Sequence, residues 1–326
     1  MAGQPVMAQL YPWLTPLWEQ WQAHLEADRF PNAALLIAKP GFGEEQLISQ
    51  FSRAVMCSHF AAEPCGFCHS CQLMESNNHP DFHWIKPEKE GKAITVDQIR
   101  QCNRLAQESS QLAGYRVIVI QPADSMNESA ANALLKTLET PSPSCLFLLV
   151  SSAASQLLPT ITSRCQQWHI SPPEAAQLTT WLAEQTQKNV PNYAAHINGN
   201  APLSTLKFIE DDEQKRYLAI EQQLVEIVSQ RGDAIKLAKD LSGDIDKSLL
   251  WLWYLLTDTQ KVHFGLQLSS TVPGAQALAE RIEYNLLYQQ TQALQTLIEQ
   301  VTQHTGLNRE LLILDWLFKF NGDTCL

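Results

Sequence analysis

The sequence predicts an α/β domain followed by an all-helical region, and three observations lead to this prediction. Continuous apolar runs alternate with amphipathic stretches in the first half of the chain. After Ile170 the composition changes, and helical periodicity continues almost to the C-terminus. The chain has 326 residues, which is too long for one ordinary domain, so more than one folded unit is expected.

Composition and charge narrow the functional classes. Hydrophobic residues make up 45% and charged residues 17%, which suits buried cores and excludes a mostly disordered chain. The formal charge of −11 disfavours a broad basic surface for nucleic acid. No apolar run reaches the ~20 residues that span a bilayer, and residues 1–10 lack the pattern of a secretory signal. We therefore expect a cytoplasmic protein that makes no membrane contact.

Three apolar runs, at residues 33–38, 117–120 and 146–150, are the predicted strands. Such continuous runs are typical of strands that are buried on both faces of a parallel sheet. A helix is predicted between the last two, with Asp124 and Ser125 as capping residues and Pro141 as the stop. A strand, a helix and a second strand in this order indicate a crossover connection and an α/β domain.

The helical region begins after a break at residues 171–174. Its predicted helices cover residues 177–185, 213–230, a strongly apolar stretch around Trp251 and Trp253, 275–287 and 291–302. We expect three domains: an α/β domain at 1–170 with an embedded module at 57–71, a small helical domain at 171–212, and a C-terminal helical domain at 213–326.

A glycine-containing loop at residues 38–45 lies between the first predicted strand and a helical pattern at 46–55. This is the position of a phosphate-binding P-loop, in which Gly41 and Gly43 would let backbone N–H groups approach phosphates. However, Glu44 stands where such a loop has its lysine, and Glu45 where it has its hydroxyl. At ~4 Å and an effective dielectric constant near 20, each charge pair is worth roughly 4 kcal/mol. The repulsion between these two carboxylates and a phosphate would therefore exceed the ~0.3–1 kcal/mol by which a helix dipole attracts the phosphate.

The second predicted strand supports the same conclusion. A P-loop ATPase places an acidic residue for Mg²⁺ at the end of this strand, but here Gln121 and Pro122 follow it. The alternative is that Gly41 and Gly43 form an ordinary turn between a strand and a helix. Because both metal-handling positions are lost together, we favour a degenerate ATPase domain that has no ATP of its own.

Four of the eight cysteines fall within fifteen positions, at Cys57, Cys65, Cys68 and Cys71. The two short spacings let one turn of chain wrap a tetrahedral ion, and Cys57 completes a closed structural zinc site. Alternatives are a redox dithiol at Cys65 and Cys68, or core cysteines with no shared role. Because four sulfurs fill the coordination shell, we expect the neighbouring His59 and His69 to face solvent.

Arg164 lies in a Ser-Arg-Cys tripeptide after the last predicted strand. An arginine in this position is most often part of a surface or structural ion pair. In P-loop folds, however, an arginine at the domain edge can reach the γ-phosphate bound by a neighbouring subunit. We therefore retain Arg164 as a candidate arginine finger acting in trans.

These features resemble the delta-prime subunits of bacterial DNA polymerase III clamp loaders, over nearly the whole chain. The segments that support the resemblance are Tyr11-Pro12-Trp13-Leu14, Pro40-Gly41-Phe42-Gly43, the four cysteines, His79-Pro80-Asp81, residues 130–139, Ser163-Arg164-Cys165 and Gly306-Leu307-Asn308-Arg309-Glu310-Leu311. ATPase subunits of clamp loaders share residues 132–139 and the Ser-Arg-Cys motif. Glu44, Gln121 and Pro122 separate this chain from those subunits.

The resemblance implies an AAA+ domain with a zinc module, a helical lid domain and a helical collar domain. It also implies a heteropentamer with delta and three gamma/tau subunits, which opens the sliding clamp and places it on primed DNA. By this resemblance Arg164 serves the ATP site of a gamma/tau subunit, and the four cysteines hold zinc. The chain would have no catalysis of its own, although it belongs to a DNA-directed DNA polymerase complex.

Two other functions remain open from the sequence. An autonomous ATPase would bind Mg-ATP as an isolated chain. A zinc-dependent DNA-binding module would bind duplex DNA in a salt-dependent way, although the charge of −11 and the weakly basic cysteine loop disfavour this function.

Overall fold

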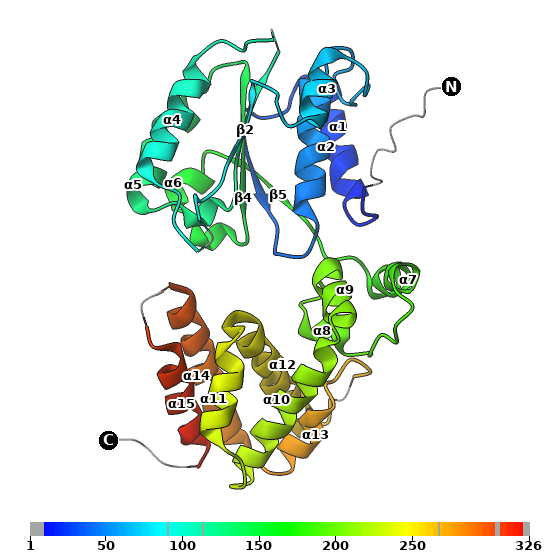
Figure 1. The fold of residues 1–326 in the computed structure, drawn as a ribbon, viewed down its shortest axis with the longest axis vertical. Helices are drawn as coiled ribbons and strands as arrows, with labels where there is room; N and C mark the ends of the chain where they lie inside the picture. The colour runs from blue at the N-terminus through cyan, green and yellow to red at the C-terminus, as the bar shows by residue number, and fades with distance from the viewer. Residues whose placement is uncertain (1–9, 90, 113, 267, 304–306, 322–326) are drawn as a thin grey trace. The chain divides into compact units, whose positions relative to one another are not determined.

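The computed structural model describes residues 10–89, 91–112, 114–266, 268–303 and 307–321. The chain divides into two compact units, Met1–Pro173 and Glu174–Leu326. The first unit is α/β and the second is helical, as the sequence predicts (Figure 1). Gly306 and most of the stretch 1–10, both used above, lie outside the described residues.

The first unit contains a sheet of five strands, and every strand pair in it is parallel. The strand order is β2-β3-β4-β1-β5. The strands are β1 (Ala33–Ile37), β2 (Phe82–Ile85), β3 (Arg116–Ile120), β4 (Cys145–Ser151) and β5 (Gln166–His169). The three predicted strands are confirmed as β1, β3 and β4, and they form the centre of the sheet.

The sequence analysis missed β2 and β5, which are the two edges of the sheet. An edge strand is covered less completely than a central one, so its sequence need not be continuously apolar. All four residues of β2 are half-buried, and β5 buries only Trp168. Arg164 therefore precedes the last strand of the sheet rather than following it, which corrects the expected position.

The parallel register brings the ends of β1 and β3 to one edge of the sheet. Ile37, the last residue of β1, pairs with Ser151 of β4. Ile120, the last residue of β3, also pairs with a residue of β4, Leu149. The loops that follow β1 and β3 consequently leave the sheet side by side.

Helices cover both faces of this sheet (Figure 1), with α1 and α2 on one face and α4 and α5 on the other. The helical segments of the unit are α1 (Thr15–Glu26), α2 (Glu44–Met56), α3 (His69–Glu75), α4 (Val96–Gln107), η1 (Ala123–Ser125), α5 (Glu128–Glu139), η2 (Ala154–Gln156) and α6 (Pro159–Thr162). Alternate residues of the central strands, such as Leu35, Ile118 and Phe147, form one buried core with α4 and α5.

The predicted capping residues of α5 are wrong. Asp124 and Ser125 belong to a separate 3-10 turn, η1. The cap is Asn127, whose side-chain oxygen accepts a hydrogen bond of 2.8 Å from the Ala130 N–H. Asn127 has extended backbone angles, which is the usual geometry of a capping residue. The helix ends at Glu139, just before Pro141, as predicted.

A buried ion pair joins β2 and β3 to the end of α4. The Arg116 guanidinium donates to Asp81 at 2.8 Å, and both side chains are at most 2% exposed. Arg116 also donates to backbone carbonyls after α4, including those of Glu108 and Ser109. Asp81 accepts from the N–H of Gln111 at 2.9 Å. Together the two side chains satisfy backbone groups in the crossover from α4 to β3 that would otherwise be unpaired.

The second unit consists of helices. They are α7 (Ala175–Gln185), α8 (Ala194–Ile197), α9 (Pro202–Glu210), α10 (Glu213–Val228), α11 (Ala234–Ser242), α12 (Ile245–His263), α13 (Gly274–Ala279), α14 (Tyr284–Gln303), α15 (Arg309–Phe318) and the 3-10 turn η3 (Lys319–Asn321). The single helix predicted at 275–287 is wrong, because α13 ends at Ala279 and α14 starts at Tyr284. No glycine or proline marks this break in the sequence.

Helix α12 contributes Trp251 to the interior of the second unit, and this side chain is fully buried. Tyr217 and Phe208 contact its ring edge-on. Trp253 is half-buried. Within the described residues, the helices are too short or too polar to cross a bilayer.

We expect Asp81→Asn to lower the free energy of unfolding by about 3–5 kcal/mol, because the buried Arg116 would keep only the exposed Glu108 carboxylate, 3.8 Å away, as a counter-charge. The matched control is Asp97→Asn, which removes an exposed partner of Arg100 and should cost less than about 1 kcal/mol. Urea unfolding of both variants at neutral pH measures the difference. Equal effects of the two changes would contradict the assigned role of Asp81.

The same pair predicts a pH dependence. Burial alone would raise the pKa of Asp81, but hydrogen bonds from Gln111 and Arg116 more than offset this and hold the pKa below its ordinary value. The stabilisation is therefore complete above the unfolded pKa of about 3.9 and is lost as the pH falls through the lower folded pKa. The difference between the original chain and Asp81→Asn should shrink over that acidic window.

Candidate functional site

The loop that follows β1 has the shape of a phosphate loop. Gly41 and Gly43 have positive φ angles of 87° and 78°, a conformation that favours glycine. Gly43 is the residue before α2, so the first N–H groups of α2 lie next to the loop, as in a phosphate site. These φ angles and the helix start are compatible with the phosphate loop that the sequence suggests.

Residues of the chain itself pack against this loop and form hydrogen bonds with it. Phe42, between the two glycines, is 2% exposed, and its carbonyl accepts a hydrogen bond of 2.7 Å from Trp13 Nε1. Gln46, in the first turn of α2, accepts a hydrogen bond of 2.7 Å from the Tyr11 N–H. The Tyr11 and Trp13 rings stack on each other. We call these contacts of Tyr11 and Trp13 with the loop the loop brace; they tie the loop to the N-terminal segment.

The charges at the loop are opposite to those of a nucleotide site. Glu44 is half-buried, and burial raises the pKa of its carboxyl group above the ordinary value. Gln121, at the end of β3, donates to Glu44 at 3.4 Å. Glu45 pairs with Lys86 at 3.2 Å. The structure therefore brings together at this loop Glu44 and Gln121, two of the residues that depart from the P-loop pattern.

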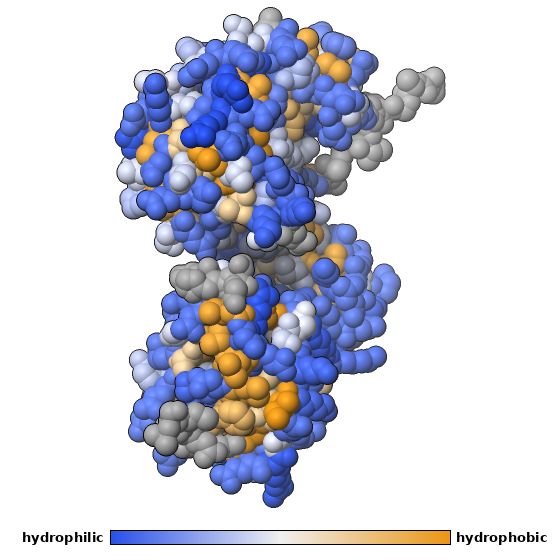
Figure 2. Space-filling model, turned by 60° about the vertical axis from the view of Figure 1, so that its left-hand side comes forward, coloured by the Kyte–Doolittle hydropathy of each residue, from blue (hydrophilic) through white to orange (hydrophobic). Residues whose placement is uncertain are grey.

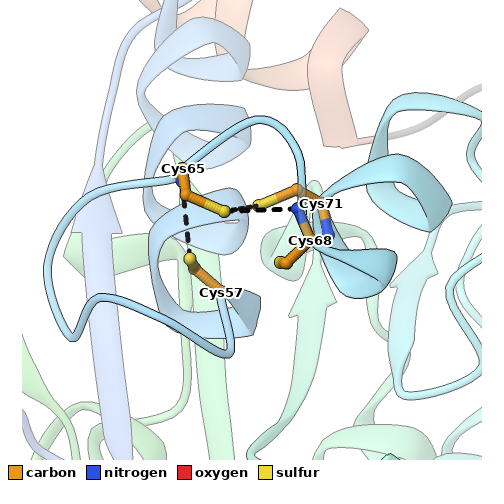
Figure 3. Close-up of side chains that lie close together, drawn as sticks. All are labelled: Cys57, Cys65, Cys68 and Cys71. Carbon is orange, nitrogen blue, oxygen red and sulfur yellow. Dashed lines mark hydrogen bonds between the residues drawn. The ribbon is translucent and has the colours of Figure 1, made fainter.

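The four predicted cysteines converge in the second feature (Figure 3). Cys57 is the residue that follows α2, Cys71 lies in α3, and Cys65 and Cys68 come from the loop between these helices. Their four sulfur atoms all lie within 4.8 Å of one another, and those of Cys65 and Cys71 are 3.9 Å apart. Zinc bonds of ~2.3 Å in a tetrahedron place sulfurs about 3.8 Å apart, so the cluster fits a tetrahedral metal site.

Backbone N–H groups point at these sulfurs. The Cys57 sulfur accepts from His59 and Cys65 at 3.5 and 3.4 Å, and although burial alone would raise the pKa of Cys57, these bonds bring it below the ordinary value. Hydrogen bonds from Ser58 similarly overcome burial and lower the pKa of Cys68 to about 5. Burial raises the pKa of Cys71 to about 12. The pKa values of Cys57 and Cys68 are thus shifted toward the thiolate form that a metal requires, whereas Cys71 would need a bound cation to ionise at neutral pH.

The cysteine loop is attached to the sheet through His79. The buried imidazole accepts at Nδ1 from the Asp81 N–H at 3.1 Å, and its Nε2 lies 2.6 Å from the Ser70 hydroxyl. Ser70 donates to the carbonyl of Met56 at 2.5 Å. Burial lowers the pKa of His79, which favours the neutral ring that this arrangement needs. His59 and His69 are exposed, in agreement with the expectation that they face solvent.

Arg164 lies just after α6 and is about one-third exposed. Its Nε donates to Glu139 at 3.0 Å, and its Nη1 donates to the Thr160 carbonyl at 2.8 Å. Glu139 is the last residue of α5. In the isolated chain Arg164 is therefore part of a surface ion pair, which was one of the two roles considered for it.

Three contributions to these sites were not predicted from the sequence. They are the packing of Trp13 on the phosphate loop, the attachment of the cysteine loop by His79, and the pairing of Glu139 with Arg164. Trp13, His79 and Glu139 all lie in segments that support the family resemblance, but the sequence did not indicate what these side chains contact. The partners are between 9 and 29 residues apart in the sequence, and no periodic pattern relates them.

Comparisons with known proteins agree with the resemblance. Residues 13–174 match the family described as DNA polymerase III, delta subunit, and residues 211–322 match its C-terminal counterpart. The chain is 33% identical to the DNA polymerase III subunit delta' of Escherichia coli over 316 residues, covering 95% of this chain and 94% of that protein. It is 37% identical to the Haemophilus influenzae subunit over 219 residues, covering 65% of this chain and 66% of that protein.

A solved DNA polymerase III gamma subunit-related protein from Thermotoga maritima aligns with 94% of this chain and 98% of its own chain. Its sequence identity is 18% and its TM-score is 0.42, so the family assignment rests on the sequence matches. The matches at 33% identity extend over nearly the full length of both proteins. The chain belongs to the family of DNA polymerase III delta' subunits.

Proposed function

We propose that this chain is a non-hydrolysing subunit of a DNA polymerase III clamp loader. It assembles with delta and gamma/tau subunits and helps the ATP-driven loader to open the sliding clamp and place it on primed DNA. Membership of the delta' family supports the clamp-loader role. The observation that supports a role without hydrolysis is the position of Glu44, hydrogen-bonded to Gln121, at the loop where a nucleotide would need a cation.

In this role a neighbouring subunit binds and hydrolyses ATP, and Arg164 contacts the γ-phosphate of the ATP bound there. An exposed ion pair such as Arg164–Glu139 is typically worth only about 0–1 kcal/mol. The guanidinium can therefore exchange the Glu139 carboxylate for a phosphate at little cost. Its planar donors bind either group in the same way.

We further propose that Cys57, Cys65, Cys68 and Cys71 hold one structural zinc ion. Four thiolates leave no open coordination position, so the ion would fix the loop between α2 and α3 without taking part in catalysis. The short distances among the sulfurs support this proposal.

The remaining parts of the proposed subunit are a lid domain at 171–212 and a collar domain at 213–326 that joins the subunits. Apart from residues 171–173, both would lie in the second unit. Figure 2 shows a band of apolar surface on one face of this unit. Large apolar side chains of the unit that are more than half exposed are Ile235, Phe264, Leu266, Leu268 and Leu311. Exposed apolar surface of this kind is typical of protein contacts, which supports assembly through the collar.

We expect the isolated chain to show no saturable binding of Mg-ATP in calorimetry. Glu44→Lys alone should not restore binding, because Glu45 and Gln121 still lack the groups that hold Mg²⁺. A gamma/tau subunit measured in the same buffer is the positive control. Saturable binding by the original chain would favour the autonomous ATPase considered above.

We expect Arg164→Ala to lower ATP turnover of the reconstituted loader. An arginine finger typically raises the hydrolysis rate at its site on the order of 10³-fold or more, and the neighbouring ATP site would lose this acceleration. The rate is measured with sliding clamp and primed DNA, and size-exclusion chromatography checks assembly. Glu139→Gln is the matched variant, since it removes the ion pair but keeps Arg164. Turnover retained in Glu139→Gln and lost in Arg164→Ala supports a finger, whereas an equal loss in both indicates a structural ion pair.

We expect the purified chain to contain about one equivalent of zinc. Cys68→Ser should reduce the content to nearly zero, whereas Cys102→Ser, which removes a core thiol outside the cluster, should leave it unchanged. Metal analysis by mass spectrometry measures both. A metal-free protein with a Cys65–Cys68 disulfide would instead favour the redox alternative.

A further inference from the structure

A cavity of about 460 Å³ opens in the first unit beside the cysteine cluster, and the proposed function makes no use of it. This volume lies within the range of roughly 300–1,000 Å³ that is usual for ligand sites. The lining comes mainly from residues 25–30 at and after the end of α1, residues 55–61 at and after the end of α2, and the loop before β3. Cys57 is one of the lining residues, so the cysteine loop forms part of the wall.

The interior of the cavity favours an apolar occupant. Leu25, Phe30, Val55, Met56 and Leu146 contribute apolar side chains to the lining. The buried polar groups in the lining already have partners within the chain, since Ser70 bonds to His79 and Asp81 bonds to Arg116. An apolar side chain can therefore enter without leaving a buried polar group unpaired.

The charges around the cavity favour a cation beside that apolar group. Glu26 and Asp28 are both exposed and both line the cavity, and the Tyr115 hydroxyl holds Asp28 by a hydrogen bond of 3.1 Å. The lining residues include no lysine or arginine. A positive charge near the two carboxylates would be attracted, whereas an acidic group would be repelled.

Two exposed apolar side chains favour a polypeptide over a small molecule as the occupant. Phe60 is 55% exposed and Leu112 is 40% exposed, and both also line the cavity. A small molecule inside the cavity would leave their outer faces in water. A polypeptide that inserts one side chain would cover them as well, in the manner of a buried anchor with a surrounding apolar rim.

We propose that this cavity docks a segment of a partner protein that presents an aromatic or large aliphatic side chain close to a lysine or arginine. The apolar side chain enters the cavity and the basic residue pairs with Glu26 and Asp28. Because residues 57–61 form one wall, the metal proposed for the cysteine cluster would shape this docking site.

The test uses the full chain and a phage-displayed library of random peptides as the probe. We expect the enriched peptides to share a large apolar residue with a basic residue close to it. A representative peptide, synthesised with a fluorescent label, is then titrated with the chain and its anisotropy is measured. Enrichment of acidic peptides, or no enrichment, would overturn the proposal.

Two variants of the chain locate the binding site. Gly114 lines the cavity, and a Cβ placed there meets no atom within 4 Å, so Gly114→Trp should fill the cavity with little strain. We expect Gly114→Trp and Glu26→Lys each to weaken peptide binding by roughly tenfold or more. Glu19→Lys is the matched control, since Glu19 is also exposed and on α1 but does not line the cavity, and binding should be unchanged. Thermal unfolding checks that each variant is folded.

Three results would overturn the proposal. Equal binding by Gly114→Trp and the original chain would place the peptide elsewhere. Saturable binding of free indole without any enriched peptide would identify a small-molecule site. A dimer of this chain that Gly114→Trp dissociates, seen by sedimentation, would identify a second copy as the occupant.

Discussion

The parallel sheet is the constraint on which the candidate nucleotide site depends. Because all strand pairs are parallel, the loops after β1 and β3 must leave the sheet at the same edge. In an active P-loop domain this edge collects a lysine, a hydroxyl and an acidic residue around one phosphate group. Here it collects Glu44 and Gln121, which bond to each other. Glu44 and Gln121 are therefore neighbours in space although they are far apart in the sequence.

A second set of contacts joins the cysteine loop to the same sheet. Ser70, His79 and Asp81 form a continuous series of hydrogen bonds from α3 to β2, and Arg116 extends it to the crossover after α4. A structural metal at the cluster would therefore fix a loop that is already bonded to the core. This explains how a small module inside a large domain can hold a defined wall of the neighbouring cavity.

Much of the fold could be predicted from the sequence, because buried central strands and amphipathic helices have clear periodicities. The two edge strands could not, since partial exposure gives β2 and β5 mixed sequences. The capping role of Asn127 was missed because Asp124 and Ser125 are equally good capping residues by type. At the sites, the four cysteines were visible from their spacing. The pairing of Glu139 with Arg164, and of Trp13 with the phosphate loop, depends on packing between distant segments.

The loop brace has a consequence for how this chain takes part in a cycle driven by nucleotides. A ligand can shift the balance between two conformations only if it binds them with different affinities. In the proposed role, Trp13 holds the Phe42 carbonyl and Gln121 bonds to Glu44, so this loop would offer ATP and ADP no cation by which to tell them apart. The chain would then keep the same shape through each turnover, and any movement it makes would follow from its neighbours.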